Sequence, residues 1–297
     1  MIEALGAFVP VAANTAFTQW RDEDDPLRKF FYQVVDQTDW KTAQEGNTTQ
    51  GMYACASDGT LFGHTFEYDL ETVLGVLRDA TKEAAKHAAK KLDLRGAKPE
   101  PAPPEGTLVV SVYTRIDPLP EGASKDNAFV GRDHLWILHE EVDALRKGQF
   151  PKTLAMRLAR FHLWDNTRGE PDAWTEEQVK KAAFGANGVL AGHATFTIGG
   201  TFSLAASAGK RSEDGRSLPE AGYEGKIEGE ITFGKEGVTS FTLLATGEAW
   251  GEGTYTPGAP AGRFPLKVAF VLPAADDPTR GVPPQGVSDG LDEYLGR

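Results

Sequence analysis

The segment that most constrains the fold of this chain is residues 48–64, which has the pattern of a tight β-hairpin. Residues 51–56 form a short apolar run, residues 57–59 supply a turn, and residues 60–62 begin a returning strand. Gly59 can adopt the positive φ that such a turn requires. The sequence therefore predicts two antiparallel strands joined by a short turn.

Helical patterns flank this hairpin on both sides. After it, Asp69 is a suitable N-cap, and apolar residues recur at three- and four-residue steps to about Leu92. Before it, residues 25–36 repeat apolar side chains at helical spacing behind Pro26, which suits a first helical turn. A short apolar run at residues 7–12 predicts a strand. The expected order is strand, helix, hairpin, helix.

This order resembles the thioredoxin superfamily over about residues 4–92. In that superfamily a Cys-x-x-Cys pair follows the first of these strands and faces a cis-proline just before the hairpin. Here residues 13–17 contain no cysteine, and Thr49 and Gln50 stand near the proline position. Thiol–disulfide exchange needs an attacking thiolate and a second thiol. Cys55, the only cysteine, falls in mid-strand, where a thiol is normally an inert hydrophobe. The resemblance implies a thioredoxin-like fold without redox activity.

A proline-rich stretch at residues 95–106 divides the chain. Proline removes backbone donors and holds the chain extended, so the preceding helix cannot continue through it. The 297 residues are enough for two domains that each bury a core. We expect a thioredoxin-like α/β domain at 1–94, a linker at 95–106 and an α+β domain at 107–297.

The second domain is expected to begin with a strand at residues 107–116 and to continue mainly as helices. Asp133 is expected to cap a helix that carries the apolar residues of the next two turns. Pro151 opens a second helical pattern, and a capping box at Thr175 opens a third, short one.

Alternating strand patterns broken by glycine fill the last third of the chain. Residues 234–237 form a short turn between two of these segments, which predicts that they pair as a hairpin. We expect an antiparallel sheet curled into a sandwich or partial barrel. The predicted strands are residues 189–206, 223–234, 238–250 and 263–272.

Charge and composition limit the partners and the compartment. The net charge is −12, with 15 acidic and 10 basic residues in 1–95 and 28 and 21 in the remainder, so the acidic excess is spread along the chain. Nucleic acid is not an expected partner, because its affinity depends on Lys and Arg. No apolar run has the length of a membrane helix. A single cysteine favours the cytoplasm, although a mature exported form without its leader would have the same sequence.

The densest polar cluster is residues 160–171, at the expected end of a helix. A catalytic interpretation makes His162 a general base or ligand, with Asp165 orienting it and Arg168 holding an anion. The alternative is that His162 satisfies a carbonyl at the helix end while the other two side chains build the turn. Sequence spacing does not decide between these interpretations.

A second cluster stands where a predicted strand ends, at residues 248–255. Its aromatic residues are suited to line an apolar pocket at the mouth of a β-structure, and its acids to acid–base work if they lie close together. Alternatively, the aromatics plug the end of the sheet. The candidate ligand-binding residues of the two clusters are Trp164, Asn166, Glu248, Trp250 and Tyr255.

The sequence leaves the cofactor open, and a divalent metal is the candidate that its histidines suggest. His134 and His139 are five residues apart and would face different sides of a helix, so they are not a chelating pair. His134, His162 and His193 could converge through the fold into a three-histidine site. The chain contains no P-loop, no Gly-x-Ser-x-Gly and no Cys-x-x-Cys motif.

Three functions follow from these patterns. The first is a redox-inactive thioredoxin-like protein that binds a small molecule or protein partner through a pocket in its second domain. The second is an enzyme, with or without a metal, whose site lies around His162, Asp165 and Arg168. The third is a small-ligand carrier that uses the β-structure and Trp250. The sequence gives no indication of oligomeric state.

Overall fold

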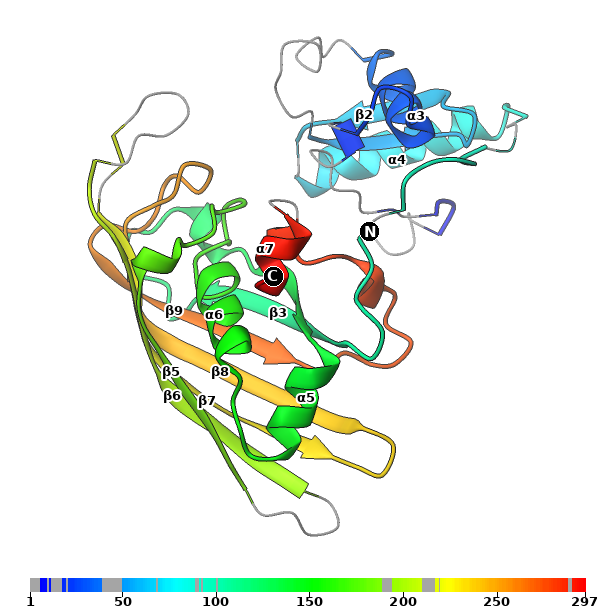
Figure 1. Ribbon diagram of the computed structural model, residues 1–297. Helices are drawn as coiled ribbons and strands as arrows, with labels where there is room; N and C mark the ends of the chain where they lie inside the picture. The colour runs from blue at the N-terminus through cyan, green and yellow to red at the C-terminus, as the bar shows by residue number, and fades with distance from the viewer. Residues whose placement is uncertain are drawn as a thin grey trace. The chain divides into compact units, whose positions relative to one another are not determined.

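The computed structural model describes residues 6–9, 11, 18–19, 21–38, 50–67, 69–88, 91, 93–99, 101–188, 194–209, 217–218, 220–287 and 290–297. The chain splits into two compact units, Met1–Glu100 and Pro101–Arg297, which we call the amino-terminal and carboxyl-terminal units (Figure 1). The division falls within the predicted linker. None of the helices in the described residues combines the length and the apolar character needed to cross a membrane.

The amino-terminal unit contains the predicted hairpin between two helices. Its described elements are α3 (Pro26–Val35), β1 (Met52–Cys55), β2 (Leu61–Thr65) and α4 (Leu70–Ala84). The two strands are antiparallel, and Gly59 in the turn has a φ of +83°. Asp69 caps α4 as expected, because its side chain accepts a hydrogen bond from the backbone N–H of Thr72 at 3.0 Å.

Two predictions for this unit are wrong. Residues 7–9 form a turn and a bend rather than a strand. Helix α4 ends at Ala84, short of Leu92, because the chain beyond it folds against the hairpin: the His87 ring lies 2.9 Å from the Asp58 carboxylate. Residues 13–17, which hold the position of the missing redox pair, lie outside the described residues. The thioredoxin-like fold therefore stays a prediction.

The carboxyl-terminal unit is built on one antiparallel sheet with the strand order β4-β3-β9-β8-β7-β6-β5. Strands β5 to β9 form a meander, and β3 continues the sheet from β9 (Figure 1). The sandwich prediction is wrong, because all seven strands of the described residues in this unit belong to one sheet. The sheet is open, with β4 at one edge and β5 at the other, and does not close into a barrel. The strands are β3 (Leu108–Ile116), β4 (Gly131–Ile137), β5 (Val179–Gly188), β6 (Ala194–Ala206), β7 (Ala221–Phe233), β8 (Val238–Trp250) and β9 (Arg263–Val271).

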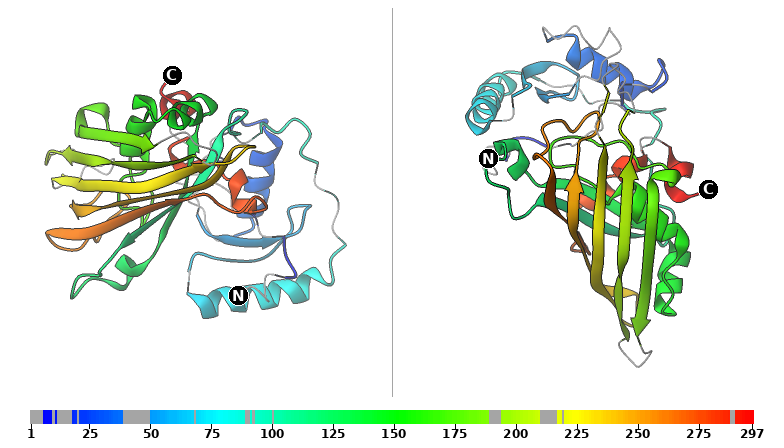
Figure 2. Two further views of the ribbon diagram at one scale, coloured as in Figure 1. Left: turned by 90° about the horizontal axis from the view of Figure 1, so that it is seen from below. Right: turned by 90° about the vertical axis from the view of Figure 1, so that its left-hand side faces the viewer.

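Helices cover one face of this sheet, and the core lies between the helices and the sheet (Figures 1 and 2). The helices are α5 (His139–Arg146), α6 (Lys152–Phe161) and the carboxyl-terminal α7 (Leu291–Leu295), with 3₁₀ turns at η2 (Lys125–Ala128), η3 (Glu176–Gln178), η4 (Pro278–Gly281) and η5 (Gln285–Val287). Alternate residues of the long strands point into the core, as the period-two pattern predicts. Fully buried examples include Phe196, Phe241, Phe264, Leu266 and Phe270.

The helix expected from Asp133 is wrong, because residues 131–137 form strand β4 and helix α5 begins only at His139. Leu135 and Ile137 point into the main core, whereas Trp136 belongs to a second apolar cluster with α7. Over so few residues, this alternation of apolar side chains cannot be distinguished from the spacing of a helix, which explains the wrong prediction. Strand β5 was not predicted, since its Ala- and Gly-rich sequence carries only a weak alternation.

Strand β4 lies at the edge of the sheet, and side-chain oxygens accept hydrogen bonds from backbone N–H groups along its open side. Two alternate backbone N–H groups of β4, and that of Leu138 directly after the strand, donate to side-chain oxygens instead of to another strand. An exposed row of such groups would be a template for pairing with another chain, so these contacts close the edge. The pairs are His134 N with Asp133 Oδ1 at 2.7 Å, Trp136 N with the Tyr294 hydroxyl at 3.2 Å, and Leu138 N with Glu141 Oε2 at 2.9 Å.

Arg157 of α6 joins the same edge to the carboxyl-terminal helix. Its guanidinium donates to the Trp136 carbonyl at 3.1 Å and pairs with Glu141 at 2.6 Å. It also donates to the carbonyls of Tyr294 at 2.9 Å and Leu295 at 3.1 Å. The Arg157 side chain is only 1% exposed. This one buried cation therefore connects α6, β4, α5 and α7.

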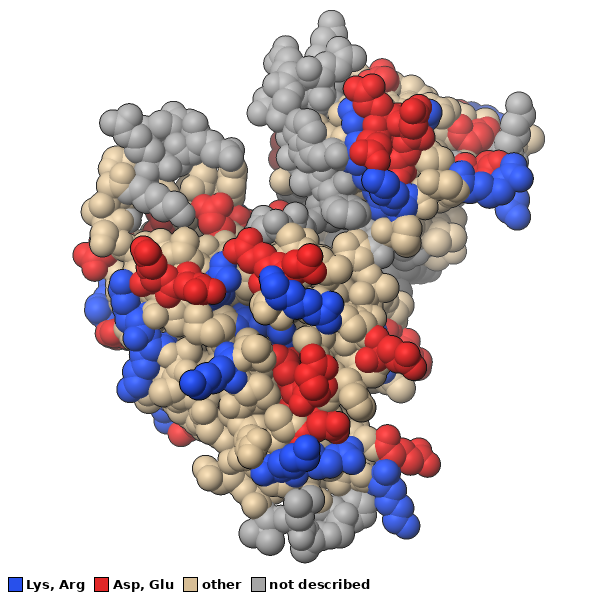
Figure 3. Space-filling view, viewed as in Figure 1, with Lys and Arg blue, Asp and Glu red and all other residues tan. Residues whose placement is uncertain are grey.

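Acidic and basic side chains are interspersed on the face of the molecule drawn in Figure 3. Lys and Arg side chains of the described residues form no continuous surface in that view. Binding to a nucleic-acid backbone needs many phosphates to be neutralised together. The described residues on this face offer no such basic surface.

Candidate functional site

A cavity of about 80 Å³ opens in the carboxyl-terminal unit where β8 ends and β7 begins. Three segments enclose it: the chain between α6 and η3, the adjoining ends of β6 and β7, and the loop that follows β8. Its aromatic lining is Trp164, Trp174, Tyr223, Trp250 and Phe264, and its polar lining is Asp165, Arg168, Asp172, Gln178, Ser207, Glu252 and Thr256.

Trp164 and Trp174 form one wall, because the chain after α6 closes back on the end of that helix. The backbone N–H of Trp174 donates to the Arg160 carbonyl at 3.0 Å, and its indole N–H donates to the Leu163 carbonyl at 3.1 Å. These bonds bring the two indole rings to a centroid distance of 5.2 Å with a 36° tilt. The loop thus holds both rings in fixed positions beside the cavity.

Trp250, the last residue of β8, forms another wall. The Arg263 guanidinium lies 4.1 Å from the centroid of its ring, and a Cβ at Gly222 would lie 2.2 Å from its Cζ2. Only glycine at that position lets the indole lie against β7. Arg263 in turn pairs with Glu224 at 2.5 Å and with Glu248 at 3.5 Å. The carboxylate of Glu248 therefore serves this ion pair outside the cavity.

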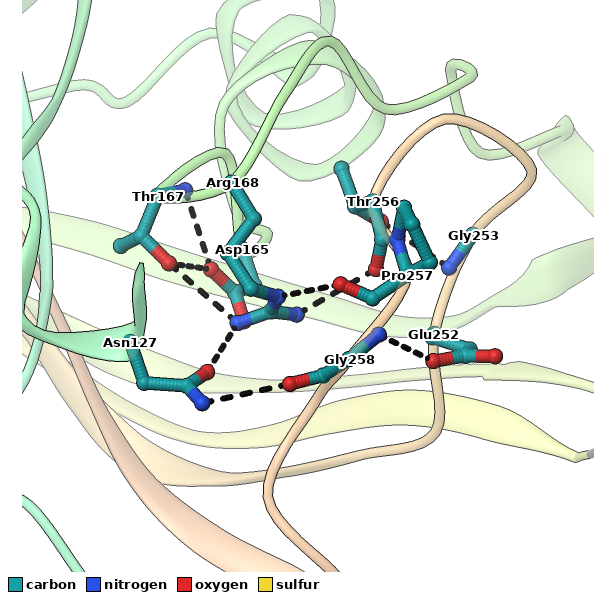
Figure 4. Close-up of polar contacts among 9 residues, drawn as sticks. All are labelled: Asn127, Asp165, Thr167, Arg168, Glu252, Gly253, Thr256, Pro257 and Gly258. Carbon is teal, nitrogen blue, oxygen red and sulfur yellow. Dashed lines mark hydrogen bonds and ion pairs between the residues drawn. The ribbon is translucent and has the colours of Figure 1, made fainter. Parts of the chain in front are cut away.

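Arg168 anchors the loop that follows β8 (Figure 4). Its guanidinium donates to the Pro257 carbonyl at 3.0 Å and to Asn127 Oδ1 at 2.8 Å, and it pairs with Asp165 at 2.7 Å. A longer bond of 3.4 Å reaches the Thr256 carbonyl. The side chain is 4% exposed. The N–H groups of the Arg168 guanidinium already donate to oxygen atoms of the protein. Arg168 therefore holds the loop in place and is not arranged to bind an anion.

Asp165 does not orient His162, as the catalytic interpretation requires. Its Oδ1 accepts hydrogen bonds from the backbone N–H and the hydroxyl of Thr167, at 3.0 and 2.6 Å, and its other oxygen pairs with Arg168. These contacts build the turn. The structural interpretation of Asp165 and Arg168 agrees with this geometry.

His162 belongs to the capped edge of β4 and not to the cavity. Its Nε2 lies 2.9 Å from the Tyr294 hydroxyl, and its Nδ1 lies 3.0 Å from the Asp133 carboxylate, without hydrogen-bond alignment. The ring is buried. Asp133 also accepts the backbone N–H of Gln285 at 2.8 Å. The predicted trio of His162, Asp165 and Arg168 is therefore divided between two places.

No cluster of three or more His, Cys, Asp or Glu side chains suited to a metal ion occurs among the described residues. His134 stands on β4 and is almost fully buried. Burial lowers its pKa, the neighbouring His162 lowers that pKa further, and the carboxylates of Asp133 and Asp277 oppose this lowering. His193, the third predicted ligand, lies outside the described residues.

Of the five predicted ligand-binding residues, Trp164 and Trp250 line the cavity. Asn166 packs against the start of β4, where a Cβ at Gly131 would meet its Oδ1. Tyr255 is 49% exposed and outside the lining. Sequence reasoning missed most of the other lining residues, among them Asp172 and Trp174 before η3, Tyr223 in β7 and Phe264 in β9. Trp174 stands directly before the capping box at Thr175, and this position was the only local sequence feature that could have indicated its place beside the cavity.

No protein-family model matches the chain, and neither the curated proteins nor the solved structures contain a match to it.

Proposed function

We propose that this chain is a binding protein whose carboxyl-terminal unit takes a small molecule with an apolar body into the cavity. The observation that carries this proposal is the convergence of Trp164, Trp174 and Trp250 on one opening. Ligand sites are typically apolar concavities with a few fixed polar groups. A volume of about 80 Å³ suits a compact group rather than a large molecule.

The polar contacts around the cavity support binding more than catalysis. Arg168 and Asp165 are engaged in building the loop, and His162 is enclosed at the edge of β4. A general base must reach the proton that it removes, directly or through one water. The enzymatic alternative therefore has less support than a preformed pocket whose walls are held by internal hydrogen bonds.

Calorimetric titration with benzyl alcohol, benzylamine and benzoate tests the proposal. We expect at least one of these probes to bind, and Ser207→Phe to weaken that binding about tenfold, because Ser207 lines the opening and a phenyl ring would fill it. Ala208→Phe is the matched control, since Ala208 is exposed and outside the lining. The proposal is overturned if none of the probes binds, or if Ser207→Phe leaves their binding unchanged.

We also propose that the amino-terminal unit is redox-inactive. Cys55, the only cysteine, lies half-buried in β1. Burial raises the pKa of its thiol, and the Asp58 carboxylate raises it further. A thiol is reactive as the thiolate, and reactive cysteines usually have a lowered pKa. These features support a packing role for Cys55.

An assay of the thiol released from a disulfide substrate tests this second proposal. The reduced protein should release no more thiol at neutral pH than a Cys55→Ser variant does, because one thiol with a raised pKa neither attacks nor resolves a mixed disulfide efficiently. Circular dichroism of the variant verifies that it folds. Catalytic turnover that depends on Cys55 would contradict redox inactivity.

A further inference from the structure

We propose that the cavity selects a small organic cation, such as a protonated or quaternary amine with an apolar body. This inference rests on the proposed binding function and assigns the ligand its charge. Three observations carry it: an aromatic lining, carboxylates at the opening that have no ion-pair partner among the described residues, and nearby guanidinium groups that are already neutralised.

Asp172 and Glu252 contribute the uncompensated negative charge. One oxygen of Asp172 accepts a hydrogen bond from the Thr254 hydroxyl at 3.2 Å, and one oxygen of Glu252 accepts the backbone N–H of Gly258 at 2.7 Å. Among the described residues, neither carboxylate forms an ion pair with a basic side chain. Each is thus positioned by a neutral donor and keeps a second oxygen for a ligand. Figure 4 shows this arrangement for Glu252.

Within the described part of the chain, the positive charges near the cavity do not cancel these two carboxylates. Arg168 is paired with Asp165 inside the lining. Arg263 lies over the Trp250 ring outside the lining and is paired with Glu224 and Glu248. The lining itself contains three carboxylates and one guanidinium. Counted over the residues that the structure describes, the remaining charge of the opening is therefore negative, which favours a cation and disfavours an anion.

The aromatic lining favours the same class of ligand. Indole rings attract cations through the negative potential of their π-systems, and Trp is the strongest of the aromatic residues in this respect. They also bury the apolar body of a small amine without requiring hydrogen bonds. The cavity volume of about 80 Å³ is small, which favours a compact cation over a large one.

A comparison of choline with 3,3-dimethyl-1-butanol tests the charge directly, because the two molecules have nearly the same shape and only choline carries a charge. We expect choline to bind about tenfold more tightly. The double variant Asp172→Asn/Glu252→Gln should remove most of this preference while it keeps both hydrogen-bond acceptors. Glu177→Gln is the matched control, since Glu177 is exposed and outside the lining.

The outcomes separate this inference from the proposed function. If the neutral alcohol binds as tightly as choline, or if the double variant keeps the full preference for choline, the cation assignment is overturned. If neither molecule binds, the assignment is also overturned. In each case the titration of the three aromatic probes with Ser207→Phe decides independently whether the cavity binds ligands at all.

Discussion

Replacement of Arg157 by methionine is expected to lower the free energy of unfolding of the carboxyl-terminal unit by about 3–5 kcal/mol. The guanidinium pairs with Glu141 at 2.6 Å, and both side chains are almost completely buried. Methionine leaves the Glu141 carboxylate without its counter-charge in an apolar surrounding. It also leaves the carbonyls of Trp136 and two residues of α7 without a donor. Urea unfolding followed by circular dichroism measures the change.

Two further variants separate the buried charge from the loss of a long side chain. Arg115→Met makes the same substitution on an exposed residue of β3 and should change the stability by no more than about 0.5 kcal/mol. Glu141→Gln combined with Arg157→Met removes the uncompensated charge and should recover part of the loss. A decrease below about 1 kcal/mol for Arg157→Met would contradict the proposed role of this residue in joining α7 to the edge of the sheet.

The elements that were predicted correctly are those whose signals are local in the sequence. The turn at Gly59 and the cap at Asp69 act within three residues of themselves, and both are present in the structure. Strands β6 to β9 carry strong alternation between apolar and polar residues. In contrast, β4 has its edge completed by Tyr294, which lies 158 residues beyond Trp136. A local stretch of sequence contains only one of these two partners. The local spacing alone therefore predicted a helix where the structure has strand β4.

The candidate site divides in the same way. Trp164 and Trp250 were selected because they stand beside the ends of predicted elements, and both line the cavity. Their convergence with Phe264 depends on the pairing of β8 with β9, which spacing does not give. His162 was selected as part of a dense polar segment. Its actual partners, Asp133 and Tyr294, come from a strand edge and from the carboxyl-terminal helix.

A pair of facing glycines controls how closely β7 and β8 approach just before they reach the cavity. Gly225 and Gly247 lie directly opposite each other in the register. A Cβ at Gly247 would lie 2.0 Å from the Glu224 carbonyl oxygen, and one at Gly225 would lie 2.1 Å from the Thr246 carbonyl oxygen. Both obstacles are backbone atoms, which cannot rotate away as a side chain does. The close approach therefore requires glycine on both strands.

Gly247→Val is accordingly expected to destabilise the carboxyl-terminal unit by about 3 kcal/mol, because the two strands must separate to admit the side chain. At a site with free space, replacing glycine would instead restrict the unfolded chain and increase stability slightly. Urea unfolding gives the sign and size of the effect. Thr246→Val is the control, since it adds no volume and changes the neighbouring residue of the same strand.

The same substitution should also weaken ligand binding. Gly247 stands two residues before Ala249 and three before Trp250, which line the cavity, so a displaced β8 moves that wall away from Trp164 and Trp174. We expect the affinity for whichever probe binds the native protein to fall in Gly247→Val and to stay unchanged in Thr246→Val, measured well below the unfolding temperature. A stable Gly247→Val protein with native affinity would show that the strands have room for a side chain, and the glycine pair would then have no part in shaping the cavity.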